Sequence, residues 1–98
     1  MSIKNKLQHI IKACLPIDMD VNKIVIEIPK DKKNGDYSSN VAFLLAKELK
    51  SSPISIANDI KDKISDEMID RIEIANPGFI NFYIIYSYIF YYFSFIVS

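Results

Sequence analysis

Hydrophobic positions recur with helical spacing in three stretches of the chain. The first covers residues 2–15, where apolar side chains three or four positions apart are Ile3, Leu7, Ile10, Ile11 and Cys14. The second runs from about residue 36 to residue 50, and its apolar stripe is Val41, Ala42, Leu45, Ala46 and Leu49. The third covers residues 53–64, with Ile56, Ala57, Ile60 and Ile64. This spacing predicts three amphipathic helices that each turn one face to a core.

The residues that flank these stretches predict where the helices begin. Ser2 and Ser52 precede the first and third helices and can accept a hydrogen bond from a free backbone N–H group. Pro53 suits the first helical position, where its missing N–H costs nothing. Asp36 and Ser38 compete for the cap of the second helix, which we expect to open directly from the polar segment around them.

Alternating apolar and polar positions predict strands at residues 23–29, 71–75 and 79–84. In the first, Ile24, Ile26 and Ile28 fall on one face. Asn-Pro-Gly at 76–78 supplies a turn between the last two strands. Beyond it, one face carries Ile80, Phe82 and Ile84, and the other carries Phe79, Asn81 and Tyr83. The elements together predict an α+β fold of two layers, a small antiparallel sheet covered on one face by helices.

Composition limits what such a domain can do. Ninety-eight residues make one small domain, and its 12 basic and 12 acidic residues cancel, so overall charge offers no attraction for nucleic acid and any RNA contact has to be local. A single cysteine, Cys14, excludes an internal disulfide and fits a reducing, cytoplasmic location. The only histidine, His9, has no second ligand nearby, and we predict neither a metal site nor catalytic residues.

The C-terminal tail is unlike the rest of the chain. Residues 82–98 carry no charge, proline or glycine, and they hold five of the six tyrosines and four of the six phenylalanines. The 20 residues from Phe79 onward match the length of a membrane-spanning helix, so a small membrane-associated protein that inserts its aromatic tail is an alternative. Tyrosine belongs to the membrane interface, and no basic cluster flanks the segment, which argues against a membrane.

The second face of the last strand is the candidate for chemistry. An aromatic ring beside an amide can stack on an unpaired base and hydrogen-bond its edge, which is how single-stranded RNA is usually read. The pattern alone leaves two alternatives open. The face can be an ordinary sheet surface, or it can be the docking edge of an interaction module that binds no RNA.

Five segments, in their order and spacing, resemble the N-terminal domain of arginyl-tRNA synthetase. They lie at residues 26–30, 35–42, 45–47, 52–57 and 72–82, and the last reads Ile-Glu-Ile-Ala-Asn-Pro-Gly-Phe-Ile-Asn-Phe. The resemblance assigns residues 1–84 to that domain. The tail at 85–98 does not resemble the continuation that the family normally has, and we expect it to be a truncated or frameshifted end.

The resemblance implies a function in tRNA binding. In the family, this domain contacts the D-loop at the outer corner of the tRNA, where an aromatic ring and amide side chains hold an exposed nucleotide. Carried over, the ring falls on Phe79 and the amides on Asn76 and Asn81. The implied partners are tRNA(Arg) and a catalytic body in cis. The ATP-binding motifs of the family are absent here, so this chain is expected to hold no cofactor, and ATP and arginine would bind the catalytic domain.

Overall fold

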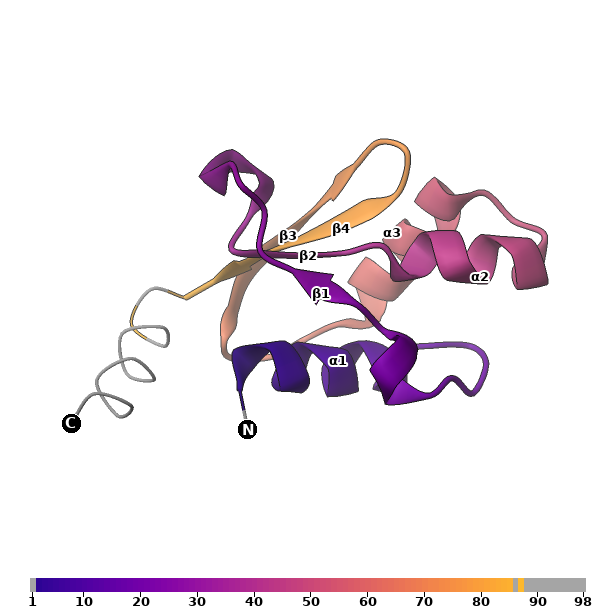
Figure 1. The fold of residues 1–98 in the computed structure, drawn as a ribbon, viewed down its shortest axis with the longest axis horizontal. Helices are drawn as coiled ribbons and strands as arrows, with labels where there is room; N and C mark the ends of the chain where they lie inside the picture. The colour runs from indigo at the N-terminus through magenta and orange to yellow at the C-terminus, as the bar shows by residue number, and fades with distance from the viewer. Residues whose placement is uncertain (1, 86, 88–98) are drawn as a thin grey trace.

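Three α-helices and four strands form two layers in the part of the chain, residues 2–85 and 87, that the computed structural model describes (Figure 1). The helices are α1 (Ile3–Ala13), α2 (Val41–Leu49) and α3 (Pro53–Lys63), with short 3₁₀ helices η1 (Val21–Lys23) and η2 (Lys32–Asn34). The strands are β1 (Ile26–Glu27), β2 (Tyr37–Ser39), β3 (Ile69–Ala75) and β4 (Phe79–Ile84). The predicted α+β class, with its antiparallel sheet, is confirmed.

The four strands form one sheet in the order β1-β2-β4-β3, and every pair is antiparallel. Strand β4 lies in the interior of the sheet, with Asn81 opposite Ser38 of β2 on one side and opposite Glu73 of β3 on the other. Figure 1 shows the β3–β4 hairpin reaching toward α3 at its turn. The strand that carries the candidate site is therefore held on both edges by backbone hydrogen bonds.

The core lies between the sheet and the helices. Ile80, Phe82 and Ile84 of β4 are all buried, as the alternation predicted. They belong to one cluster with Ile72 of β3 and with buried residues of all three helices, among them Leu7, Ile11, Val41, Leu45, Ile56 and Ile60. Because successive side chains of a strand alternate between faces, burial of these positions turns Phe79, Asn81 and Tyr83 to the other face.

Two predicted helix starts are confirmed. The Ser2 hydroxyl accepts a hydrogen bond from Asn5 N–H at 3.1 Å at the start of α1. The Ser52 hydroxyl accepts one from Ser55 N–H at 3.2 Å at the start of α3, where Pro53 takes the first helical position. Each serine satisfies a backbone donor that the helix itself leaves without a partner.

The start of the second helix was predicted wrongly. Residues 37–39 form β2 instead of helical entry, and α2 begins only at Val41. Asp36 and Ser38 do not cap it: Asp36 accepts from Ile84 N–H of β4, and Ser38 donates to Asn81. The Ser39 hydroxyl accepts from Val41 N–H at 3.2 Å. A strand of three residues is too short to show a period of its own, and only its pairing with distant strands defines it.

The first strand is also shorter than predicted. Residues 21–23 form η1, and only Ile26 and Glu27 pair with β2. Ile24 and Ile26 are buried as expected, but Ile28 is 59% exposed. Alternation predicted which side chains share a face, but the core does not extend as far as Ile28.

No helix in the described residues is long and apolar enough to cross a membrane. The predicted tail at 85–98, apart from Ile85 and Ser87, lies outside the described residues.

Candidate functional site

The turn between β3 and β4 is tight and anchored against α3. Gly78 N–H donates to the Ala75 carbonyl at 2.8 Å, and the peptide bond between Asn76 and Pro77 is cis. A Cβ atom at Gly78 would lie 2.7 Å from Cβ of Pro53, closer than such atoms approach in proteins. The turn and the first residue of α3 are therefore packed directly together, which fixes where β4 begins.

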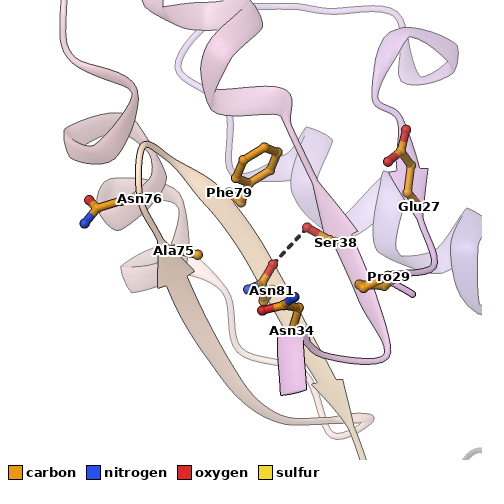
Figure 2. Close-up of a pocket in the computed structure, with 8 residues that line it drawn as sticks. All are labelled: Glu27, Pro29, Asn34, Ser38, Ala75, Asn76, Phe79 and Asn81. Carbon is orange, nitrogen blue, oxygen red and sulfur yellow. Dashed lines mark hydrogen bonds between the residues drawn. The ribbon is translucent and has the colours of Figure 1, made fainter. Parts of the chain in front are cut away.

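A hollow of about 340 Å³ opens on the face of the sheet that the core does not use, and it is lined by Glu27, Pro29, Asn34, Ser38, Ala75, Asn76, Phe79 and Asn81. Figure 2 shows these side chains around the hollow, drawn from all four strands and the two loops beside them. All three residues that the resemblance singled out are among them. A hollow of this size is open enough to admit one flat ring system.

Phe79 supplies the apolar wall of the hollow. Phe79 is the first residue of β4 after the turn, and it is 41% exposed. Its ring meets the ring of Phe43 from α2 edge to face, with the centroids 5.0 Å apart and the planes at 64°. Aromatic pairs favour this geometry, so Phe43 supports one side of the Phe79 ring while the rest stays accessible. An accessible ring held in one orientation can stack on a nucleobase.

Asn81 lies deeper, at the floor of the hollow. It is on the predicted face, opposite Ile80 and Phe82, but only 5% of it is exposed. In the sheet it lies between Ser38 of β2 and Glu73 of β3, whose side chains stand on the same face beside it. Its Oδ1 accepts a hydrogen bond from the Ser38 hydroxyl at 2.8 Å, drawn as the dashed line in Figure 2. One end of the amide is thus held by the protein.

Asn76 lines the hollow only at its rim. It lies in the turn and is exposed, and in Figure 2 its amide is directed away from Phe79 and Asn81. The structure therefore brings Phe79 and Asn81 together in the hollow and leaves the Asn76 amide outside that pair.

The loop that contains η2 completes the hollow from the other side. The Tyr83 hydroxyl donates to the Lys33 carbonyl, which ties this loop to β4 and sets the next residue, Asn34, at the hollow. The Arg71 guanidinium lies 3.8 Å above the centroid of the Tyr83 ring, a favourable cation–π contact. Tyr83 thus joins the loop, β4 and the β3 edge on the open face.

Charge on this face is nearly balanced. Arg71 Nε donates to a Glu73 carboxylate oxygen at 2.7 Å. This hydrogen bond raises the pKa of the Arg71 guanidinium and lowers the pKa of the Glu73 carboxyl, so both stay ionised at neutral pH. Among the described residues, no lysine or arginine lines the hollow itself, and its one charged group is Glu27. The hollow can recognise shape and hydrogen-bonding groups, but it offers no cation to a phosphate.

Sequence reasoning missed five of the lining residues, and Ser38 matters most among them because it holds Asn81. It was assigned to a helix cap, since a serine before an apolar run is typical of one. Its contact with Asn81 joins residues 43 positions apart, and no local pattern encodes such a pair. The arrangement as a whole suits noncovalent binding. The described residues contain no group of three histidine, cysteine or acidic side chains that could hold a metal ion.

Comparison with known proteins gives a consistent result. Residues 1–84 match the family model described as the arginyl tRNA synthetase N terminal domain. The chain is similar to the arginine–tRNA ligase of Listeria welshimeri, with 40% identity over 89 residues, which are 89% of this chain and 16% of that protein. It is 44% identical to the arginine–tRNA ligase of Bacillus licheniformis over 87 residues, 84% of this chain and 15% of the relative. The chain thus spans about a sixth of the length of these relatives.

Two solved structures have the same fold. The arginyl-tRNA synthetase of Thermus thermophilus superposes with a TM-score of 0.77 at 23% identity, over 93% of this chain and 15% of that one. The arginyl-tRNA synthetase of Plasmodium falciparum gives a TM-score of 0.73, also at 23% identity, over 89% of this chain and 17% of the other.

Proposed function

Because the chain belongs to the arginyl-tRNA synthetase N-terminal domain family, we propose that it is the tRNA-binding part of a cytoplasmic arginine–tRNA ligase. Residues 1–84 form the binding domain. It holds an exposed nucleotide of the D-loop, at the outer corner of tRNA(Arg), while a catalytic body carries out aminoacylation with ATP and arginine. The family membership is shown by sequence, and the role in D-loop recognition is our inference.

The observation that carries this proposal is the pairing of Phe79 and Asn81 in one hollow. Phe79 presents a supported ring at the mouth, and Asn81 presents an amide at the floor. An unpaired base that stacks on the ring would place its edge toward the amide. This combination of stacking and edge recognition is the usual way in which proteins read single-stranded RNA loops.

Affinity has to come partly from elsewhere. Stacking of one base contributes roughly 1–3 kcal/mol, and this chain has no net charge to attract the phosphate backbone. The isolated domain therefore binds tRNA weakly. In an intact synthetase, the catalytic body holds the tRNA near the domain, so that the second contact forms at a high effective concentration.

The test is a chimera in which residues 1–84 replace the matching segment of the Listeria welshimeri ligase. In this protein, Phe79→Ala should raise the KM for tRNA roughly 5- to 150-fold, since it removes a stacking interaction of the size given above. The KM for arginine should not change, because arginine binds the catalytic body. Steady-state aminoacylation with each substrate varied in turn measures both constants.

Leu44→Ala is the matched control. Leu44 on α2 is 43% exposed, close to the value for Phe79, and it does not line the hollow. This variant should leave both KM values at the level of the parent chimera. Equal increases in the two constants for Phe79→Ala, or no change in either, would argue against the proposal.

A further inference from the structure

We propose that Ser38 is a positioning residue that fixes which end of the Asn81 amide faces the hollow. Its hydroxyl donates to Oδ1 of Asn81, and this leaves the Nδ2 hydrogens as the group presented to a ligand. The site therefore reads a hydrogen-bond acceptor on the edge of the bound base. This inference rests on the proposed function, because it specifies which bases the same hollow accepts.

The sheet register places the two side chains face to face. Ser38 of β2 lies directly opposite Asn81 of β4, and Oγ and Oδ1 are 2.8 Å apart. A carboxamide has a donor end and an acceptor end that are nearly equal in shape, so packing alone does not decide which way it turns. In the structure the Ser38 hydroxyl donates to Oδ1, and at 5% exposure water has little access to compete for that bond. Because a hydroxyl can also accept from Nδ2, the orientation depends in addition on the groups that face the other end of the amide.

The one charged group that lines the hollow favours the same orientation. Glu27 contributes a carboxylate, which only accepts hydrogen bonds. If Oδ1 of Asn81 also faced the hollow, both Asn81 and Glu27 would present only hydrogen-bond acceptors to it. With Nδ2 turned inward, the hollow offers a donor beside an acceptor, and base edges carry complementary groups of both kinds.

Ser38 is itself held in place from the preceding residues. Asp36 N–H donates to the Phe82 carbonyl at 2.8 Å, and the Asp36 carboxylate accepts from Ile84 N–H at 2.9 Å. A Cβ atom at Gly35 would lie 2.9 Å from the Phe82 carbonyl oxygen, so the chain there lies directly against β4. These contacts fix the register of β2 on β4 and with it the position of the Ser38 hydroxyl.

The experiment titrates the 98-residue chain with a tRNA(Arg) transcript at low salt and follows ¹⁵N–¹H spectra, which report weak binding as progressive shifts. Asn81→Ala and Ser38→Ala should each raise the Kd about 2- to 10-fold, the range expected for one hydrogen bond. The double variant should bind like Asn81→Ala alone, because Ser38 acts only through Asn81.

A second pair of variants removes the hydroxyl at constant size. Ser38→Thr keeps the donor and Ser38→Val replaces it by a methyl group, and both side chains suit a strand. Threonine should bind tRNA as the parent does, and valine should bind as Ser38→Ala does. Ser65→Ala, at an exposed serine that does not line the hollow, is the control and should change nothing. In the parent, the Asn81 side-chain NH₂ signals should shift as tRNA is added.

The outcomes separate the two proposals. If Asn81→Ala weakens binding but Ser38→Val does not, or if the effects of Ser38→Ala and Asn81→Ala multiply in the double variant, the positioning role is wrong and the proposed function stands. If the Asn81 side-chain signals do not shift when tRNA is added, and if Asn81→Ala leaves the Kd unchanged, the proposed function itself fails.

Discussion

Phe79 and Asn81 lie two positions apart on one strand, but they differ in solvent exposure. Phe79 is the first residue of β4, where β3 pairs with it but β2 does not, and 41% of it is exposed. Asn81 lies where β4 is flanked by two strands, and 5% of it is exposed. The Phe79 ring therefore offers contact area at the mouth of the hollow, and the Asn81 amide offers a directional hydrogen bond at its floor.

Gly78 is the residue on which the start of β4 depends. Gly78→Ala would place a methyl group 2.7 Å from Cβ of Pro53 and 2.9 Å from its carbonyl carbon, so the turn or α3 has to move. Overpacking of this kind costs about 1–3 kcal/mol. We expect the free energy of unfolding, measured by urea denaturation, to fall by this amount. An unchanged free energy of unfolding would show that the turn and α3 are not packed as described.

Local pattern identified some residues of the site but not others. Alternation along β4 separated Ile80, Phe82 and Ile84 from Phe79 and Asn81, and the burial of the first three follows from that period. The roles of Phe79, Asn81 and Asn76 came from resemblance to a family. Ser38 and Phe43 could not be found in this way, since they meet the site only through the folded sheet and α2.

At the scale of elements, β2 shows how a very short strand can be specified. Its three residues pair with β1 on one side and β4 on the other, although Tyr-Ser-Ser carries no strand period. Asp36, the residue before β2, fixes the strand against β4, because its backbone N–H and its carboxylate both form hydrogen bonds with β4. The segment was predicted as the start of a helix because cap residues and strand ends use the same polar side chains.

The connection between α2 and α3 offers a matched pair of serines for testing the start of α3. Ser52→Ala removes the hydroxyl that accepts from Ser55 N–H, and it should lower the free energy of unfolding by about 0.5–2 kcal/mol. Ser51→Ala removes the neighbouring exposed hydroxyl, which does not cap the helix, and should leave stability unchanged. Urea denaturation of both variants measures the difference. Equal losses would mean that the cap is not what stabilises the start of α3.

At the scale of the whole molecule, charge and size set the limits of the domain. Twelve basic and twelve acidic residues give no net charge, and the hollow is lined by no cation within the described residues. The chain spans about a sixth of the length of its relatives. A domain without net charge is suited to local recognition and not to general attraction of nucleic acid.

The two-layer α+β architecture could be predicted because helical spacing and strand alternation are local properties. The order of the strands could not, since it depends on β2 entering between β1 and β4. The same insertion creates the hollow, because it brings Ser38 to Asn81 and sets Glu27 across from both. The contacts of Ser38 and Glu27 with the site depend on the strand order, and they could therefore not be predicted from the sequence.

The most direct measurement places a photoreactive benzoylphenylalanine at position 79 of the chimera and maps the cross-linked tRNA nucleotide by reverse transcription. Our account predicts a single dominant stop in the D-loop of tRNA(Arg), which excess unlabelled tRNA(Arg) removes, and no such stop for the same group at position 44. Cross-links at the anticodon or acceptor stem, or equal labelling from both positions, would contradict it.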